Sequence, residues 1–238
     1  MSFAPEFFTL NLRFAEKVVA VSDQTFAQAL FNYTHLYLSL GLGRGFDPEH
    51  PLWQEFLRGV AAAEDKTSYT HAFHLQHAPP KEMPNPAFGC FSYAVWEGGR
   101  IRLHFHNAEA AGVSPLARER VPQRVAELRE LFTHVGEHVP HAGAVVGGSW
   151  LYNLEAYHRL FPPAFIATAR PSYADFQFSA MWGQFMDRAG GVRAQLAEKF
   201  LARLEQAANL AEVKSSFPYP MLRLESAIEA FYTWYDLR

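Results

Sequence analysis

The stretch F-G-C-F-S-Y-A-V-W-E-G-G-R-I-R-L-H-F-H-N, at residues 88–107, decides the fold class of this chain. It holds two segments rich in aromatic and β-branched residues, at 88–96 and 100–107, and Glu97-Gly98-Gly99 between them is typical of a hairpin turn. Apolar and polar residues alternate in the second segment. Ile101, Leu103 and Phe105 therefore share one face, and Arg102, His104 and His106 share the other. The pattern predicts a β-hairpin with one buried and one polar face.

Helical patterns flank this hairpin on both sides. We expect helices at about 23–40, 48–63, 122–138, 192–211 and 222–236, a short helix near 154–160, and further strands at 69–77, 143–149 and 164–170. Prolines crowd residues 79–86 and break the chain there. The predicted class is α/β (α+β), with a helical N-terminal region at 1–80. A mixed, largely antiparallel sheet flanked by helices follows at 81–238.

The composition excludes several function classes. The 238 residues carry 21 basic and 24 acidic side chains, a net charge of −3, without a Lys/Arg cluster, so we expect no nucleic-acid partner. Neither a signal peptide nor a run of 18 apolar residues is present, which indicates a soluble, cytoplasmic protein without a membrane partner. Cys90 is the sole cysteine, so an intramolecular disulfide is excluded, and we interpret Cys90 as a core residue rather than a nucleophile. The oligomeric state stays open.

Two histidine patterns raise the question of a metal site. His104 and His106 could reach one ion from the same strand face, but Arg102 on that face would repel a cation, so we favour a polar strand face. His134, Glu137 and His138 match H-x-x-E-H, in which two histidines hold zinc and the glutamate activates water. Helical spacing places both histidines on the flank of the buried stripe. This position argues against a buried zinc site, so no metal is assigned, and a zinc-dependent hydrolase is kept only as an alternative function.

A third set, His71, His74 and His77, lies in the segment expected to be a strand at 69–77. Because side chains alternate along a strand, His74 would point away from the other two histidines. The three histidines are therefore not expected to share an ion.

Three short motifs carry a family resemblance. L-H-F-H at 103–106, S-W-L-Y at 149–152 and L-R-L-E-S-A at 222–227 resemble the C-terminal domain of GNAT-like acyltransferases, in which the last motif lies in the final helix. That family has a strand ending L-H-I-P, a strand ending S-W-L-L and a helical N-terminal domain. The chain departs from it at His106, which replaces a proline, and at Tyr152, which replaces a leucine. The R/Q-x-x-G-x-G/A loop that holds the pyrophosphate of CoA is also missing.

The resemblance implies transfer of an acyl group from acyl-CoA to the amine of a small molecule. Transfer of this kind needs a base near the acceptor and an acid for the leaving thiolate. The candidate base is His104 or His106, and the candidate acid is Tyr152. The candidate substrate-binding residues are Ser149, Trp150, Asn153 and Arg170, of which Trp150 also fits a core position and Arg170 a surface ion pair. Because the CoA loop is missing, a non-catalytic binding or interaction protein on a degenerate acyltransferase scaffold is a second hypothesis.

Overall fold

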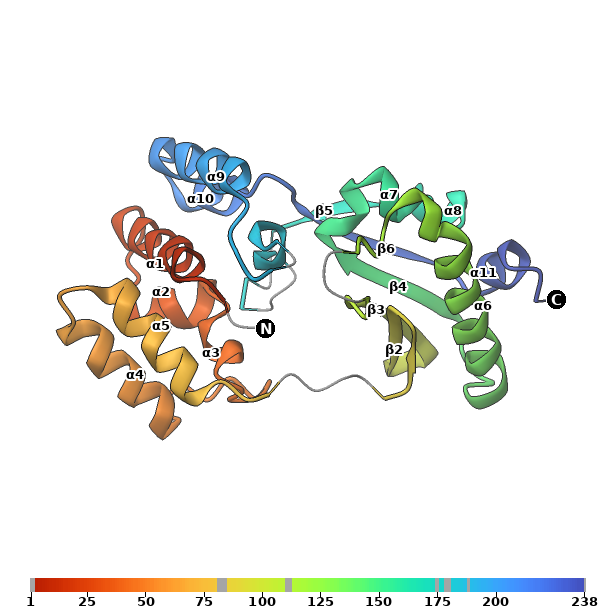
Figure 1. Ribbon diagram of the computed structural model, residues 1–238, viewed down its shortest axis with the longest axis horizontal. Helices are drawn as coiled ribbons and strands as arrows, with labels where there is room; N and C mark the ends of the chain where they lie inside the picture. Colours follow the sequence, from red (N-terminus) through yellow and green to blue (C-terminus); the bar gives the residue numbers. More distant parts are fainter. Residues whose placement is uncertain are drawn as a thin grey trace. The chain divides into compact units, whose positions relative to one another are not determined.

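The computed structural model divides the chain into two compact units (Figure 1). It describes residues 3–80, 85–109, 113–173, 176–177, 181–187 and 189–237. One unit combines Met1–Lys81 with Tyr173–Tyr219, and the other combines Glu82–Ser172 with Pro220–Arg238. We expected one boundary, between residues 80 and 81, and did not predict that residues 173–219 belong to the N-terminal unit. Their aromatic side chains explain the return, because Phe200 and Phe217 pack on Phe14 with ring centroids 5.9 and 5.3 Å apart.

The first unit is helical in its described residues. Its helices are α1 (Pro5–Ala20), α2 (Phe26–Tyr33), α3 (Leu36–Ser39), α4 (Pro51–Ala62), α5 (Lys66–His77), α9 (Ala194–Gln206) and α10 (Leu210–Ser215), with a 3₁₀ turn, η4, at Trp182–Phe185. Among the residues described for the whole chain, none of the helices has both the length and the apolar character needed to cross a bilayer.

Two helices of this unit differ from the expected ones. The helix expected at about 23–40 is broken at Thr34, which has an extended backbone and donates its hydroxyl to Leu30 O at 2.5 Å. The helix expected from residue 48 begins instead at Pro51, and the ring of His50 accepts the Leu52 N–H at 3.3 Å. In both places a local side-chain bond to the backbone sets the boundary.

The strand expected at 69–77 is wrong, because this segment forms α5. The Asp65 side chain accepts the Ser68 N–H at 3.0 Å and caps the helix. The buried residues are Thr70, Phe73 and His74, at the i, i+3, i+4 spacing of one helix face. The alternation of aromatic residues that suggested a strand therefore does not mark a buried face, since Tyr69 and His71 are only partly buried.

The second unit is built on an open six-stranded sheet of order β1-β2-β3-β4-β6-β5. The strands are β1 (Ala87–Phe88), β2 (Phe91–Trp96), β3 (Arg100–Phe105), β4 (Ala144–Ser149), β5 (Arg170–Ser172) and β6 (Met221–Ala227). The helices are α6 (Val121–His138), α7 (Glu155–His158), α8 (Pro163–Ile166) and α11 (Glu229–Trp234), with 3₁₀ turns η1 (Glu97–Gly99), η2 (Arg118–Arg120) and η3 (Trp150–Asn153). Neighbouring strands are antiparallel except β3 and β4, which are parallel. The predicted class, a mixed and largely antiparallel sheet with helices, is confirmed.

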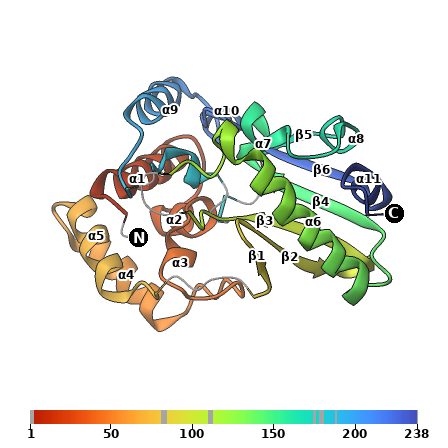
Figure 2. The same cartoon turned by 45° about the vertical axis from the view of Figure 1, so that its right-hand side comes forward.

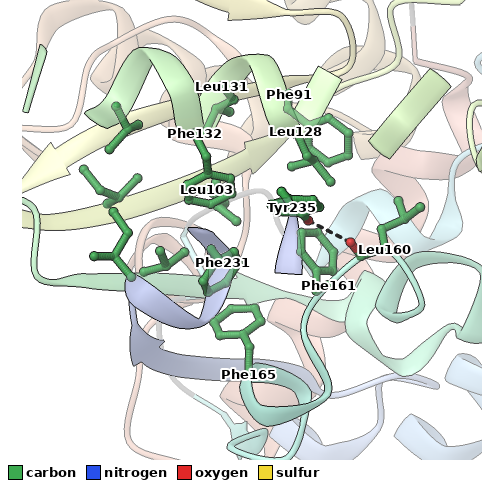
Figure 3. Close-up of a cluster of buried hydrophobic side chains, with 14 of the residues drawn as sticks. Phe91, Leu103, Leu128, Leu131, Phe132, Leu160, Phe161, Phe165, Phe231 and Tyr235 are labelled. Atoms are coloured by element: carbon green, nitrogen blue, oxygen red, sulfur yellow. Dashed lines mark hydrogen bonds between the residues drawn. The ribbon is translucent and has the colours of Figure 1, made fainter. Parts of the chain in front are cut away.

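The core of this unit lies on one face of the sheet. Ile101, Leu103 and Val145 from the strands meet apolar side chains of the four helices, and α6 runs across this face in Figure 2. Figure 3 shows Phe132 of α6 close to Phe231 and Tyr235, and the Tyr235 hydroxyl donating to Leu160 O at 2.7 Å. We call the opposite face of the sheet the open face.

The C-terminal segments also differ from the expected elements. The helix expected at 222–236 is wrong in its first half: the L-R-L-E-S-A motif lies in β6, which pairs with β4 along 222–227. Only its second half is helical, as α11. The strand expected at 164–170 is replaced by α8, with Pro163 at its first position, followed by β5. Sheet pairing decided the conformation of β6, because leucine, glutamate and alanine favour a helix when taken alone.

Candidate functional site

The carboxyl ends of the parallel strands β3 and β4 form the most distinctive feature of the sheet. The two strands pair only at Arg100–Arg102 and Ala144–Val146. Beyond these pairs, β3 continues against β2 alone and β4 continues against β6. In open sheets, ligands bind outside the carboxyl ends of parallel strands where neighbouring connections diverge.

An open hollow of about 1000 Å³ lies among the connections that leave these two strand ends. One wall comes from the segment between β3 and α6, and the other from the segment between β4 and α8. The lining residues are Arg118, Val121, Pro122, Asn153, Leu154, Glu155, Ala156 and Arg159.

The hollow favours an anion. Arg118 is exposed, and Arg159 is half-buried. The Arg159 Nη2 donates to Leu116 O at 3.0 Å, while its buried Nε has no hydrogen-bond partner in the described part of the chain. The first two residues of the 18-residue helix α6, Val121 and Pro122, line the hollow, so the positive end of the helix dipole lies there, although the Val121 N–H already donates to Arg118 O. Two guanidinium groups and a helix N-terminus thus outweigh the single carboxylate of Glu155.

Two glycines at the end of β4 permit close packing on both faces of the sheet. A Cβ at Gly147 would lie 2.6 Å from the Tyr152 hydroxyl on the core face, and one at Gly148 would overlap the Arg102 guanidinium on the open face. Arg102 donates through Nη2 to Gly148 O at 3.0 Å and lies over the Trp96 ring, 5.1 Å from its centroid. Side chains larger than hydrogen are therefore excluded at this point of β4.

Two buried tyrosines stand behind Gly147. Tyr152 in η3 and Tyr157 in α7 share a side-chain hydrogen bond, and their ring centroids are 4.9 Å apart. Burial raises the pKa of both hydroxyls well above the usual value for tyrosine. Both phenols therefore stay protonated at neutral pH and can act as hydrogen-bond donors. Tyr152 is a candidate from the sequence, whereas Tyr157 is not, because only the packing of α7 reveals its position.

Of the other candidate substrate-binding residues, three stabilise the local structure or lie away from the hollow, and Asn153 lines the hollow. Ser149 accepts the Leu151 N–H at 3.1 Å and caps η3, and Trp150 is buried. Asn153 donates to Trp150 O at 2.7 Å and Pro220 O at 2.9 Å while also lining the hollow. Arg170 is exposed on β5 and donates to Ala169 O at 2.8 Å. Among these four residues, Asn153 has the most direct access to a ligand in the hollow.

The two histidines of the hairpin occupy the free end of β3. His104 pairs with Ser92 of β2, one position beyond the last core residue Leu103, and is half-buried. Strand alternation places it on the open face with Arg102. His106 follows the strand, and its N–H donates to Cys90 O at 3.0 Å.

A buried ionic network beside the hairpin was not foreseen. Arg124 is 1% exposed; its Nη2 lies 2.8 Å from a carboxylate oxygen of Glu109 and 2.7 Å from one of Glu127, and its Nη1 contacts the sulfur of Cys90. Glu127 also accepts the Cys90 N–H at 3.0 Å. Burial raises the pKa of the Cys90 thiol and of the Glu127 carboxyl. The protonated, enclosed thiol agrees with a core role for Cys90.

One signal could have revealed this network. Arg124 lies four residues before Leu128 and seven before Leu131, so it falls on the buried stripe of α6. A charged residue on such a stripe requires a buried partner.

The H-x-x-E-H motif lies at the end of α6. His134 Nδ1 is 2.9 Å from the Tyr93 hydroxyl, and the His134 and His138 rings stack with centroids 3.9 Å apart. Glu137 is 65% exposed and lies 4.0 Å from His138 Nδ1. The described residues contain no group of three or more His, Cys, Asp or Glu side chains arranged to hold a metal.

A second titratable pair lies in the helical unit. His35 and His74 are close enough to interact electrostatically, and the Nδ1 of each is buried without a hydrogen-bond partner among the described residues. His74 packs against Phe8, with ring centroids 5.1 Å apart. Burial lowers the pKa of each imidazole to about 4. Both rings are therefore neutral at physiological pH.

Comparison with known proteins adds no assignment. No protein-family model, curated protein or solved structure matches the chain. Inference about function therefore rests on the geometry at the carboxyl ends of β3 and β4.

Proposed function

We propose that the sheet unit binds an acyl-CoA and transfers its acyl group to the amine of a small molecule. The observation that carries this proposal is the hollow among the connections that leave β3 and β4, which Arg118, Arg159 and the first residues of α6 line. CoA carries a pyrophosphate and a further phosphate, and guanidinium groups and helix N-termini are the usual protein partners of phosphates.

The positions of the motifs support the same proposal. L-H-F-H ends β3 and S-W-L-Y follows the end of β4, so both motifs that resemble GNAT-like acyltransferases border the region where the parallel strands cease to pair. The chain has no glycine-rich phosphate loop before α6, and Pro122 in the first helical turn has no N–H to donate. Arginine side chains would replace the missing backbone donors.

The chemistry requires two proton transfers. An amine becomes nucleophilic when a base removes its proton, and the thiolate of CoA leaves more easily when an acid protonates it. His104 is the candidate base on the open face. Tyr152, bonded to Tyr157 and held protonated by burial, is the candidate acid. The two side chains approach the separated strand ends from opposite faces of the sheet.

Binding of CoA provides the direct test. Isothermal titration of the full chain with acetyl-CoA, CoA and adenosine 3′,5′-bisphosphate should detect binding. Arg118→Ala should weaken it by about tenfold, since one charged hydrogen bond to phosphate contributes about 1.5 kcal/mol. Arg129→Ala is the matched control, because Arg129 lies on α6, which directly follows η2, is 47% exposed and is outside the hollow. Absence of binding at millimolar ligand, or equal effects of both variants, would refute the proposal.

A non-catalytic binding protein is the second candidate. The observation that favours it is the burial of Tyr152 and Tyr157, which are only 4% and 2% exposed. Release of free thiol from acetyl-CoA in the presence of mixed amines separates the two candidates. Binding of CoA without any thiol release would favour the binding protein.

A further inference from the structure

The C-terminal end of α6 carries two histidines whose rings lie together. His134 and His138 are four residues apart, so they occupy the same side of the helix. Their rings stack, with centroids 3.9 Å apart and planes inclined by 11°. The side chain of His138 is 58% exposed and that of His134 is half-buried, so a small ligand can reach the pair from solvent.

Hydrogen bonds occupy one nitrogen of each ring. His138 Nδ1 lies 3.0 Å from His134 O. Because a carbonyl oxygen can only accept, the proton is on Nδ1, and the Nε2 of the neutral His138 ring carries a lone pair. His134 Nδ1 lies 2.9 Å from the Tyr93 hydroxyl, which can accept its proton in the same way. In the described part of the chain, no group hydrogen-bonds to the Nε2 of either ring. Both Nε2 atoms are therefore available to a ligand.

These contacts are the ones that metal-binding histidines make. A histidine that binds a metal through one nitrogen almost always donates its other N–H to a carbonyl, a carboxylate or water. His138 Nδ1 has two such partners, the carbonyl of His134 and the Glu137 carboxylate 4.0 Å away. Two metal–nitrogen bonds of about 2.0–2.1 Å let one ion join nitrogens up to about 4 Å apart. The 3.9 Å separation of the rings fits this span, and a tilt of the exposed His138 ring would direct both lone pairs at one ion.

We propose that the Nε2 atoms of His134 and His138 bind one divalent transition-metal ion of the class of Zn²⁺, Ni²⁺ and Cu²⁺. Imidazole is a preferred ligand of these ions, and water fills the coordination positions that the two rings leave open. The proposal does not depend on the acyltransferase. It also differs from a zinc hydrolase, because the Glu137 carboxylate lies on the Nδ1 side of His138, whereas a metal-bound water would lie on the Nε2 side.

A bound ion would stabilise the end of α6. The two nitrogens come together only when residues 134–138 are helical, so the ion binds the folded chain in preference to the unfolded one. Gly136 lies between the two histidines, and glycine weakens a helix. The helix then ends at Val139, whose backbone is no longer helical. This turn is therefore one in which a link between successive turns adds to stability.

Copper titration of the full chain, purified without a histidine tag, tests the proposal. Electron paramagnetic resonance with one equivalent of Cu²⁺ should show two nitrogen ligands. His134→Ala and His138→Ala should each leave one nitrogen and weaken binding by more than about tenfold. Tyr93→Phe removes only the partner of His134 Nδ1, so it should weaken binding by about tenfold while two nitrogens remain. His158→Ala, which changes a histidine of α7, is the matched control and should alter neither affinity nor spectrum.

Thermal unfolding gives a second readout. Zn²⁺ should raise the melting temperature of the unchanged chain and of His158→Ala but not that of His138→Ala, and Mg²⁺, which prefers oxygen ligands, should have no effect. Absence of binding by all three transition metals, or binding that survives His138→Ala, overturns the proposal. Circular dichroism of each variant before titration establishes that it is folded. Since the His138 side chain is 58% exposed, His138→Ala keeps the test decisive should His134→Ala fail to fold.

Discussion

Replacement of Arg124 by methionine should destabilise the sheet unit strongly. Arg124 is 1% exposed and contacts Glu109, Glu127 and Cys90, while the two carboxylates are only 13% and 11% exposed. Removing one partner of a buried ion pair leaves charge without compensation, which costs about 3–5 kcal/mol. Because the carboxylates retain some contact with water, we expect a loss of about 3 kcal/mol at pH 7.

The pH dependence gives this prediction a second readout. Burial already raises the pKa of Glu127, and loss of the guanidinium should raise it further. A carboxyl whose pKa is higher in the folded state binds protons more readily there. The stability of Arg124→Met should therefore rise as the pH falls from 7 toward the raised pKa.

Urea unfolding followed by circular dichroism and tryptophan fluorescence measures both effects. Arg124→Met combined with Glu127→Gln should recover about 1–2 kcal/mol of the loss, because the double variant removes one of the uncompensated charges. A loss below about 1 kcal/mol for Arg124→Met, or no recovery in the double variant, would contradict the account of the network.

Two further predictions concern other parts of the chain. The helical unit should lose stability as the pH falls from 6.5 to about 4, because the unfolded chain protonates His35 and His74 while burial in the folded unit opposes their protonation. The urea concentration at the unfolding midpoint should fall over this pH range. The variant His74→Phe should show a smaller fall. Gly147→Ala should cost about 1–3 kcal/mol by pressing on the Tyr152 hydroxyl, and Gly143→Ala, where a Cβ meets nothing within 4 Å, should be nearly neutral in thermal unfolding.

The helices and strands that were predicted correctly are those for which periodicity, residue type and turn residues all indicate the same structure. The hairpin of β2 and β3 is confirmed because its alternation, its β-branched and aromatic residues and its glycine turn indicate the same structure. The helix α6 is confirmed for the same reason, since its apolar residues recur at helical spacing. Elements with conflicting signals were mispredicted. Alternating aromatics suggested a strand where the Asp65 cap begins α5, and the helix-favouring composition of 222–227 concealed β6.

The candidate site was only partly predictable. His104, Tyr152 and Asn153 were named from a resemblance carried by short motifs, and all three lie near the carboxyl ends of β3 and β4. Tyr157, Arg118 and Arg159 were missed, because nothing in their local sequence distinguishes them from surface or core residues. Their importance depends on the hollow that two separate connections form.

The sequence by itself determined the hairpin, the apolar stripe of α6 and the mixed class of the fold, because periodicity and turn chemistry act over a few neighbouring residues. Tertiary structure alone decided which distant charges meet. Arg124 meets Glu109 and Cys90 through the packing of α6 on the sheet, and Arg102 meets Gly148 through the pairing of β3 with β4. The order of the strands depends on how the whole core face of the sheet is buried, and no short stretch of sequence determines the free energy of that burial.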